Sequence, residues 1–165
     1  VDFDYKVPNV YQSCCSSELL TVLLSDGTNL NVHPTDNSSS IEWGGYLTNI
    51  DSIIDVKFLP SALADFAGLY KTEQIVLQLG TGDYAASLCD SLSAFDCDDW
   101  YLPSLGELNV IYEQLGSNGD NSMPDGEYWS STEFSSQIAW TMSFVTSGQA
   151  LEEKNKLYRC RCVRK

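Results

Sequence analysis

Six cysteines carry most of the chemical potential of this sequence. They are Cys14, Cys15, Cys89, Cys97, Cys160 and Cys162, and no two of them form a C-x-x-C pair. Structural zinc sites usually take two ligands from such a pair, so disulfides are the stronger interpretation and zinc is the weaker one. Disulfides persist in oxidising surroundings. The six cysteines are therefore expected to be disulfide partners, with no more than two free thiols, in an extracellular, cell-surface or virion-surface protein.

Cys160 and Cys162 are two residues apart in a segment that alternates like a strand, Leu157–Arg164. Residues i and i+2 of a strand point to the same face, about 7 Å apart. That separation is too large for a disulfide between them. Each of the two is therefore expected to need its own partner.

Oxygen-bearing side chains crowd the loop from Asn118 to Glu127. Such oxygens are the ligands that calcium takes, so calcium is the ion that this loop could hold. We favour the alternative interpretation, in which the side chains of this loop are simply hydrated. The sequence thus predicts no metal site and no cofactor.

A short polar connection between two expected strands is the candidate ligand-binding site. It offers one exposed aromatic ring together with amides, hydroxyls and a carboxylate, a mixture suited to adaptable recognition. We combine it with a second polar turn, residues 146–149, into one binding face. The predicted ligand-binding residues are Thr132, Glu133, Phe134, Gln137 and Gln149.

The sequence lacks the pairs of residues that nucleophilic catalysis requires. Its single histidine, His33, is followed by Pro34 and has no serine or cysteine motif beside it, so a structural role is expected. We expect no enzymatic activity and no catalytic residues. The four tryptophans, Trp43, Trp100, Trp129 and Trp140, are expected to pack in the core rather than to stack on sugars.

Length and charge exclude several classes of protein. The 165 residues suit one domain, 1–165, in which residues 1–19 are a possible N-terminal connector. The net charge of −14 repels phosphate and anionic lipid, so we expect no nucleic-acid partner and no membrane insertion. No apolar run is long enough to span a bilayer. The chain begins with Val1 rather than methionine, which fits a removed leader or a piece of a longer protein.

The positive charge is concentrated at the C-terminal end. The last twelve residues hold Lys154, Lys156, Arg159, Arg161, Arg164 and Lys165, whereas all 23 acidic residues precede them. The alternation in Leu157–Arg164 predicts a closing strand whose arginines lie against the acidic body. Its removal is expected to unfold the domain, and Cys162→Ser to destabilise it more than Lys154→Ser.

The elements that must position these residues follow from hydrophobic spacing and turn signals. Asp26-Gly27 predicts a hairpin over residues 19–33. Helices are expected at 72–79, 83–93 and 105–115, the last with a Ser104/Glu107 capping box. Strands are expected at 128–131, 138–144, 149–153 and 158–164. Helices in the middle and a strand meander at the end indicate an α+β fold.

Five separated motifs resemble the DUF1566 family, also described as the C-terminal domain of the Legionella collagen-like adhesin. They are Asp83–Cys89, Asp99–Asn109, Tyr128–Thr132, Ala139-Trp140 and Arg161–Arg164. The resemblance implies a C-type-lectin-like (formylglycine-generating-enzyme-like) fold, a twisted antiparallel sheet with two main helices and long loops, and neighbouring termini. It also implies a Cys89–Cys162 disulfide, and a display or adhesion role rather than catalysis.

The leading hypothesis is a non-enzymatic recognition module of the adhesin or receptor-binding type, on a cell or virion surface. Its partner would be a surface glycan or protein, and the module could be a homo-oligomer, such as a trimer, or part of a larger assembly. The alternative is a structural capping or decoration domain of a fibre, filament or virus particle, for example a phage tail fibre.

Overall fold

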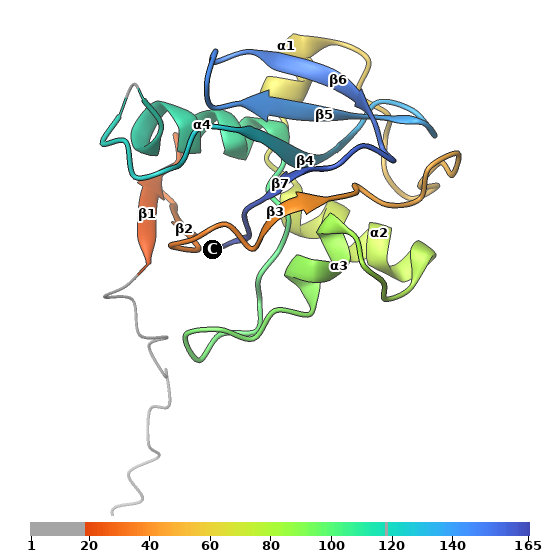
Figure 1. Ribbon diagram of the computed structural model, residues 1–165, viewed down its shortest axis with the longest axis horizontal. Helices are drawn as coiled ribbons and strands as arrows, with labels where there is room; N and C mark the ends of the chain where they lie inside the picture. The colour runs from red at the N-terminus through yellow and green to blue at the C-terminus, as the bar shows by residue number, and fades with distance from the viewer. Residues whose placement is uncertain (1–18, 118) are drawn as a thin grey trace, which may run out of the picture.

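The computed structural model describes residues 19–117 and 119–165. Residues 1–18, which include most of the predicted connector, lie outside that description. The elements are β1 (Leu20–Leu23), β2 (Asn29–Val32), β3 (Ser38–Ile41), α1 (Leu59–Leu63), α2 (Gly68–Leu79), α3 (Ala85–Asp90), α4 (Leu105–Leu115), β4 (Glu127–Glu133), β5 (Ile138–Ser143), β6 (Gln149–Glu153), β7 (Tyr158–Cys160) and β8 (Val163–Arg164). The predicted α+β class is confirmed (Figure 1).

The strands form two sheets, of order β3-β7-β4-β5-β6 and β1-β2-β8. The larger sheet is mixed rather than purely antiparallel, because the chain leaves β6, crosses to the far side of β4 and pairs there in parallel, with Tyr128 opposite Arg159. The predicted closing strand is also divided. Its first part, β7, belongs to the larger sheet, and its last part, β8, pairs with β2 in the smaller one.

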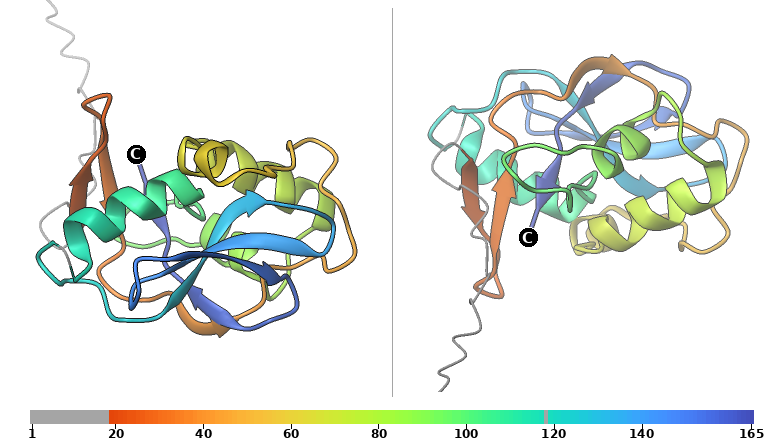
Figure 2. Two further views of the ribbon diagram at one scale, coloured as in Figure 1. Left: turned by 90° about the horizontal axis from the view of Figure 1, so that it is seen from above. Right: turned by 90° about the horizontal axis from the view of Figure 1, so that it is seen from below.

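The larger sheet has a hydrophobic core on each face. Adjacent residues of β4 separate the two cores: Tyr128 packs with α1 and α4, whereas Trp129 packs with α2 and α3. Both views of Figure 2 show α4 beside the β1–β2 hairpin. The four tryptophans are buried, as expected, and each indole N–H donates to a backbone carbonyl, of Ser130, Cys97, Ile41 and Val56 among others.

Helix α4 begins as the sequence predicts, with the Ser104/Glu107 capping box. Helix α2 begins earlier than predicted, at Gly68 rather than Thr72. A Cβ atom at Gly68 would lie 2.3 Å from Oε2 of Glu107 and 2.8 Å from the Ser104 backbone nitrogen. The missing side chain therefore lets α2 approach the start of α4, and it also removes the apolar signal that would have marked the start of the helix.

The cysteines follow the expectation in part. Cys89 in α3 is bonded to Cys162, with 5.4 Å between their Cα atoms, as the family resemblance implies. Cys97 is also disulfide-bonded. The expectation that Cys160 has its own disulfide partner is wrong, because Cys160 is a free, buried thiol. Cys14 and Cys15 lie outside the described residues.

The basic C-terminal end is neutralised by the body, as predicted. Arg159 and Arg161 both pair with Asp36, which stands between β2 and β3. The remaining pairs are Lys154–Glu133, Lys156–Glu152, Arg164–Asp99 and Lys165–Glu107. The closing segment is thus fastened to distant parts of the chain by charge as well as by strand pairing.

Two further expectations concern metals and membranes. Among the described residues, the cysteines 89, 160 and 162 form the one group of three or more potential metal ligands, and the acids of the loop up to Glu127 form none. Residue 118 of that loop is not described. None of the helices within the described ranges is both long and apolar enough to cross a membrane.

Candidate binding surface

Thr132, the first predicted ligand-binding residue, is completely buried. Its hydroxyl donates to Oδ2 of Asp65 at 2.7 Å and accepts the backbone N–H of Leu105 at 3.0 Å. The prediction placed Thr132 in an exposed connection, which is wrong because β4 continues two residues beyond its predicted end, to Glu133. Thr132 thus joins the sheet to the start of α4.

Glu133, the second predicted residue, is also completely buried, and it forms an ion pair with Lys154. Its oxygens accept the backbone N–H of Ile50 at 3.3 Å. Burial raises the pKa of Glu133 and lowers that of Lys154, while the attraction within the pair opposes both shifts. The carboxylate that was expected to contact a ligand is therefore internal, and it fixes the loop around Ile50 to the sheet.

Phe134 and Gln137 do lie in the β4–β5 connection. Gln137 is exposed, but Phe134 is half-buried, with its ring edge-on to Trp140 at a centroid distance of 6.1 Å. The Nζ of Lys57 lies over the Phe134 ring, 4.4 Å from its centroid, and donates to the Phe134 carbonyl. The structure thereby joins this connection to residues 54–58, a segment that the sequence did not single out.

Gln149, the last predicted residue, belongs to a different region of the surface. Its amide lies 3.5 Å from Oδ1 of Asn109 in α4. The β4–β5 connection precedes β5 and the turn at residues 146–149 follows it, so the two are separated by the length of that strand, about 20 Å. The two segments therefore do not form one binding face, and the prediction that combines them is wrong.

A groove lies beside residues 52–58. It consists of two adjoining cavities of about 410 and 230 Å³, which share Ile54 and Val56. We call it the Ile54 groove. Tyr70 and Lys71, at the start of α2, line the larger cavity, and Phe58 lines the smaller one.

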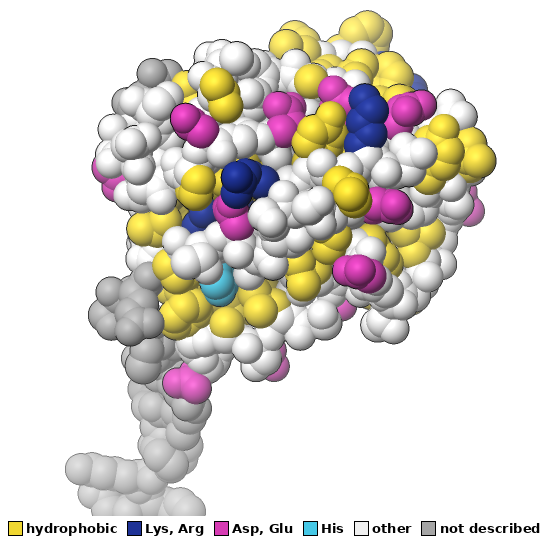
Figure 3. All heavy atoms as spheres, in the orientation of Figure 1, with side chains coloured by type: hydrophobic (Ala, Val, Ile, Leu, Met, Phe, Trp, Pro, Cys, Tyr) yellow, Lys and Arg dark blue, Asp and Glu magenta, His cyan; other side chains and the backbone are white. Residues whose placement is uncertain are grey.

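Large apolar side chains stand exposed around the Ile54 groove. Ile54 is 83% exposed, Phe58 73% and Tyr70 50%. Figure 3 shows hydrophobic side chains gathered along the upper edge of the molecule, over α1. Single exposed apolar residues are ordinary, but several around one cavity mark interaction sites. The Ile54 groove therefore has the chemistry of a binding surface.

The lining of the groove is held in place by polar contacts, of which one is a buried ion pair. Lys71 pairs with Asp65, and both side chains are 8% exposed. The Tyr70 hydroxyl donates to the Ser52 carbonyl at 3.0 Å, which ties α2 to the loop. On the other side, the indole N–H of Trp140 donates to the Val56 carbonyl at 2.8 Å. The groove is thus preformed, so a partner that fills it would not need to order it first.

The buried acid Glu107, in the first turn of α4, gives a prediction about pH. Glu107 is completely buried, and its carboxylate accepts the Tyr101 hydroxyl at 3.0 Å and the Ser104 backbone N–H at 2.9 Å. Burial raises the pKa of Glu107, and the Ser104 N–H and the Lys165 ammonium oppose the rise. A folded-state pKa above the unfolded value contributes stability that is complete below the unfolded pKa and is lost as pH rises through the folded pKa.

Glu107→Gln is therefore expected to remove one pH-dependent contribution to stability. Between about pH 4 and pH 7, wild type should lose stability relative to Glu107→Gln, because the Glu107 carboxyl group ionises more readily in the unfolded chain than in the folded protein, whereas glutamine does not ionise. Urea unfolding of both proteins at several pH values measures the difference. A free-energy difference between the two proteins that stays constant over this range would contradict the prediction.

Few features of the sequence indicate this surface. Residues 41–69 have no sustained hydrophobic period, so their apolar residues cannot be assigned to a face. One signal was available, since Lys57 and Lys71 are two of only three cations before residue 154 and both line the groove. Their pairing with Asp55 and Asp65 appears only in three dimensions.

Comparisons with known proteins give a likeness of fold. No protein-family model and no curated protein matches the chain. Among solved structures, the chain is similar to a fimbrial protein from Bacteroides ovatus, with a TM-score of 0.54 and 18% identity. The match covers 81% of this chain and 35% of that one, so this chain corresponds to about a third of the fimbrial protein. At this identity the likeness concerns the fold alone.

Proposed function

We propose that this chain is a non-enzymatic surface module that binds a protein partner through the Ile54 groove. The observation that carries the proposal is the exposure of Ile54 and Phe58 beside two adjoining, preformed cavities. Anchors of this kind, seated next to pockets, are typical of the centres of protein interfaces. The buried ion pair at the groove floor, Lys71–Asp65, would fix the orientation of the partner.

A protein partner suits the groove better than a glycan. The tryptophans, the best platforms for sugar stacking, are buried, and their indole N–H groups are engaged. The exposed lining is mainly apolar, whereas a glycan requires many hydrogen-bonding groups. Thr132 and Glu133, the hydroxyl and carboxylate of the predicted ligand-binding site, are internal. These features support recognition of apolar side chains.

The absence of catalysis belongs to the same proposal. The Nδ1 of His33 lies 2.8 Å from the Thr35 carbonyl, and the imidazole ring packs edge-on against Phe95 and Trp100. The buried acids Glu107 and Glu133 are engaged in structural contacts. The proposal also includes three further parts, which the order of the sequence motifs supports. They are membership of the DUF1566 family, a C-type-lectin-like topology and a location on a cell or particle surface.

A second candidate function is a structural part of a surface appendage. It is favoured by the similarity of fold to a fimbrial protein, of which this chain would correspond to one portion. In that role the Ile54 groove would contact a neighbouring subunit. This neighbour would be either a different protein of the same assembly or a second copy of this chain in a homo-oligomer such as a trimer.

Replacing Ile54 and Phe58 together by aspartate is expected to weaken partner binding by about tenfold or more, because two apolar anchors are lost and charge enters the groove. The measurement is binding of the labelled full chain to a panel of intact cells, with a glycan array expected to remain blank. Val145→Asp is the matched control, since Val145 is 62% exposed but follows β5, away from the groove.

Equal losses in the control and in the double variant would contradict a role for the groove, and specific signals on the glycan array would contradict a protein partner. Absence of binding to every cell, together with concentration-dependent self-assembly that the double variant abolishes, would favour the structural candidate. Both aspartate variants should keep the wild-type Tm, because the replaced side chains are exposed.

A further inference from the structure

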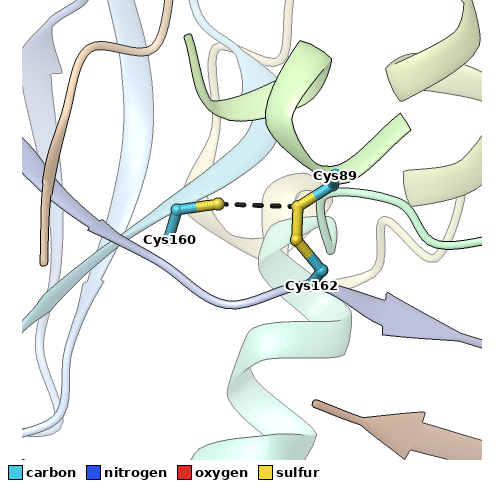
Figure 4. Close-up of side chains that lie close together, drawn as sticks. All are labelled: Cys89, Cys160 and Cys162. Atoms are coloured by element: carbon cyan, nitrogen blue, oxygen red, sulfur yellow. Dashed lines mark hydrogen bonds between the residues drawn. A yellow bond between two sulfur atoms is a disulfide. The ribbon is translucent and has the colours of Figure 1, made fainter. Parts of the chain in front are cut away.

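A third sulfur lies against the disulfide that fastens the closing segment. The Sγ of Cys160 is 3.5 Å from the Sγ of Cys89, and the sulfurs of Cys89, Cys160 and Cys162 all lie within 4.8 Å of one another (Figure 4). All three residues are fully buried. Cys89 thus faces two cysteines of the same segment, although it is bonded to only one of them.

We propose that Cys160 is an alternative disulfide partner of Cys89, so that the bridge can move from residue 162 to residue 160. In the exchange, the Cys160 thiolate attacks the Sγ of Cys89 and forms the new bond. The Cys89–Cys162 bond breaks, and Cys162 leaves as a thiolate, which takes up a proton equivalent to the one that Cys160 released. The number of disulfides is unchanged, so the step needs no oxidant or reductant.

The folded protein holds the bridge at Cys162. Attack on a disulfide requires the entering and leaving sulfurs to be nearly collinear with the sulfur between them. At 3.5 Å from Cys89, a collinear Cys160 sulfur would lie beyond 5 Å from that of Cys162, about one S–S bond length further away, but the two are within 4.8 Å. Burial, reinforced by the charge of Asp36, also raises the pKa of the Cys160 thiol to about 12. Exchange therefore requires the segment to open locally.

Moving the bridge would change which sheet is tied to α3. Cys160 is the last residue of β7 in the larger sheet, whereas Cys162 immediately precedes β8 in the smaller one. With the bridge at Cys160, β8 keeps only its noncovalent contacts, such as the Val163 N–H to the Tyr101 carbonyl at 3.0 Å. The exchange would act as a covalent switch that holds or loosens the C-terminal strand.

Disulfide mapping of Cys162→Ser tests the proposal, with Cys160→Ser as the matched control. The oxidised, folded variants are alkylated without reduction, digested and analysed by mass spectrometry. We expect a Cys89–Cys160 bridge in Cys162→Ser and a Cys89–Cys162 bridge in Cys160→Ser. In Cys162→Ser, hydrogen exchange at Val163 should be faster than in the control. A folded Cys162→Ser in which Cys89 is alkylated, or is bonded to any other cysteine, would overturn the proposal.

The wild-type protein supplies a second arm that does not depend on the folding of a variant. It is held in urea near the midpoint of its unfolding transition at about pH 8.5, where an exposed thiol is half ionised, and is then quenched with acid and mapped. Both Cys89–Cys160 and Cys89–Cys162 bridges are expected among the quenched molecules. If Cys89 is found bonded to Cys162 alone, the proposal is wrong.

Discussion

A chain truncated after Glu153 is expected to show no cooperative unfolding transition. The truncation removes β7, which lies between β3 and β4 in the larger sheet, and β8, which pairs with β2 in the smaller one. It also removes both Cys160 and Cys162, so that Cys89 loses its bridge to this segment; loss of a native disulfide typically costs about 2–5 kcal/mol in a small domain. The remaining body keeps all 23 acidic residues and loses six cations, so self-repulsion rises at the same time.

Thermal and urea unfolding followed by circular dichroism measure this effect. The truncated chain should be insoluble, or should retain secondary structure without a sharp transition. Lys156→Ser is a suitable control for changes in this segment, because Lys156 is exposed and pairs with Glu152 at the surface. A truncated chain with a cooperative transition at the wild-type Tm would refute the central place of the closing segment.

Lys154→Ala is expected to lower the Tm by roughly 10 °C, because breaking a buried ion pair by removing one partner costs about 3–5 kcal/mol. Lys154 and Glu133 are both completely buried. The Lys154 ammonium also donates to the Thr48 carbonyl at 2.9 Å and lies 4.3 Å from the centre of the Trp43 ring. Its loss would leave Glu133 in the interior without its counter-ion, so that the carboxyl group must either stay charged at a cost or take up a proton.

Two comparisons make the Lys154 prediction specific to a buried pair. Lys156→Ala should leave the Tm nearly unchanged, since Lys156 is exposed and pairs with Glu152 at the surface. The double variant Glu133→Gln/Lys154→Met should recover part of the loss, because it removes both charges and keeps an acceptor for the Ile50 N–H. A Lys154→Ala protein as stable as Lys156→Ala would show that the pair contributes nothing.

The ranking of substitutions differs from the one that the sequence suggests. From the sequence, Lys154 is one of six similar cations, and Cys162→Ser is expected to cost more than Lys154→Ser. From the structure we expect the reverse order, for two reasons. The Lys154 side chain is completely buried in its ion pair with Glu133, and in the proposed exchange Cys160 takes over the bridge to Cys89 when Cys162 is absent.

The parts of the fold that the sequence predicts are those with local or strongly patterned signals. The Asp26-Gly27 turn gives the first hairpin, and Ser104 with Glu107 gives the start of α4. The alternation of the closing segment predicts strand structure, but not its division between two sheets, because the break at residues 161–162 depends on where each sheet ends. The separation of acidic and basic residues along the sequence predicts that this segment forms ion pairs with the body, but not which acids are its partners.

The candidate site was harder to predict because burial there is decided by distant residues. Thr132 and Glu133 look like the start of a polar turn, yet partners from residues 65 and 154 keep them inside the structure. The Ile54 groove lies where the loop at residues 52–58 contacts the start of α2. The loop has no hydrophobic periodicity that would predict this contact. Phe134, expected to be the exposed aromatic, is covered by Lys57, while Phe58 is exposed instead.

Site-specific photocrosslinking tests the proposed function most directly. The full chain is prepared with benzoylphenylalanine in place of Phe58, or in place of Val145, and is irradiated on the cells or assemblies that it binds. The proposal predicts a discrete protein adduct from position 58, whose yield falls when unlabelled wild type is added. It predicts no adduct from position 145. Equal adducts from both positions, or binding without any adduct from position 58, would show that the Ile54 groove is not the surface that holds the partner.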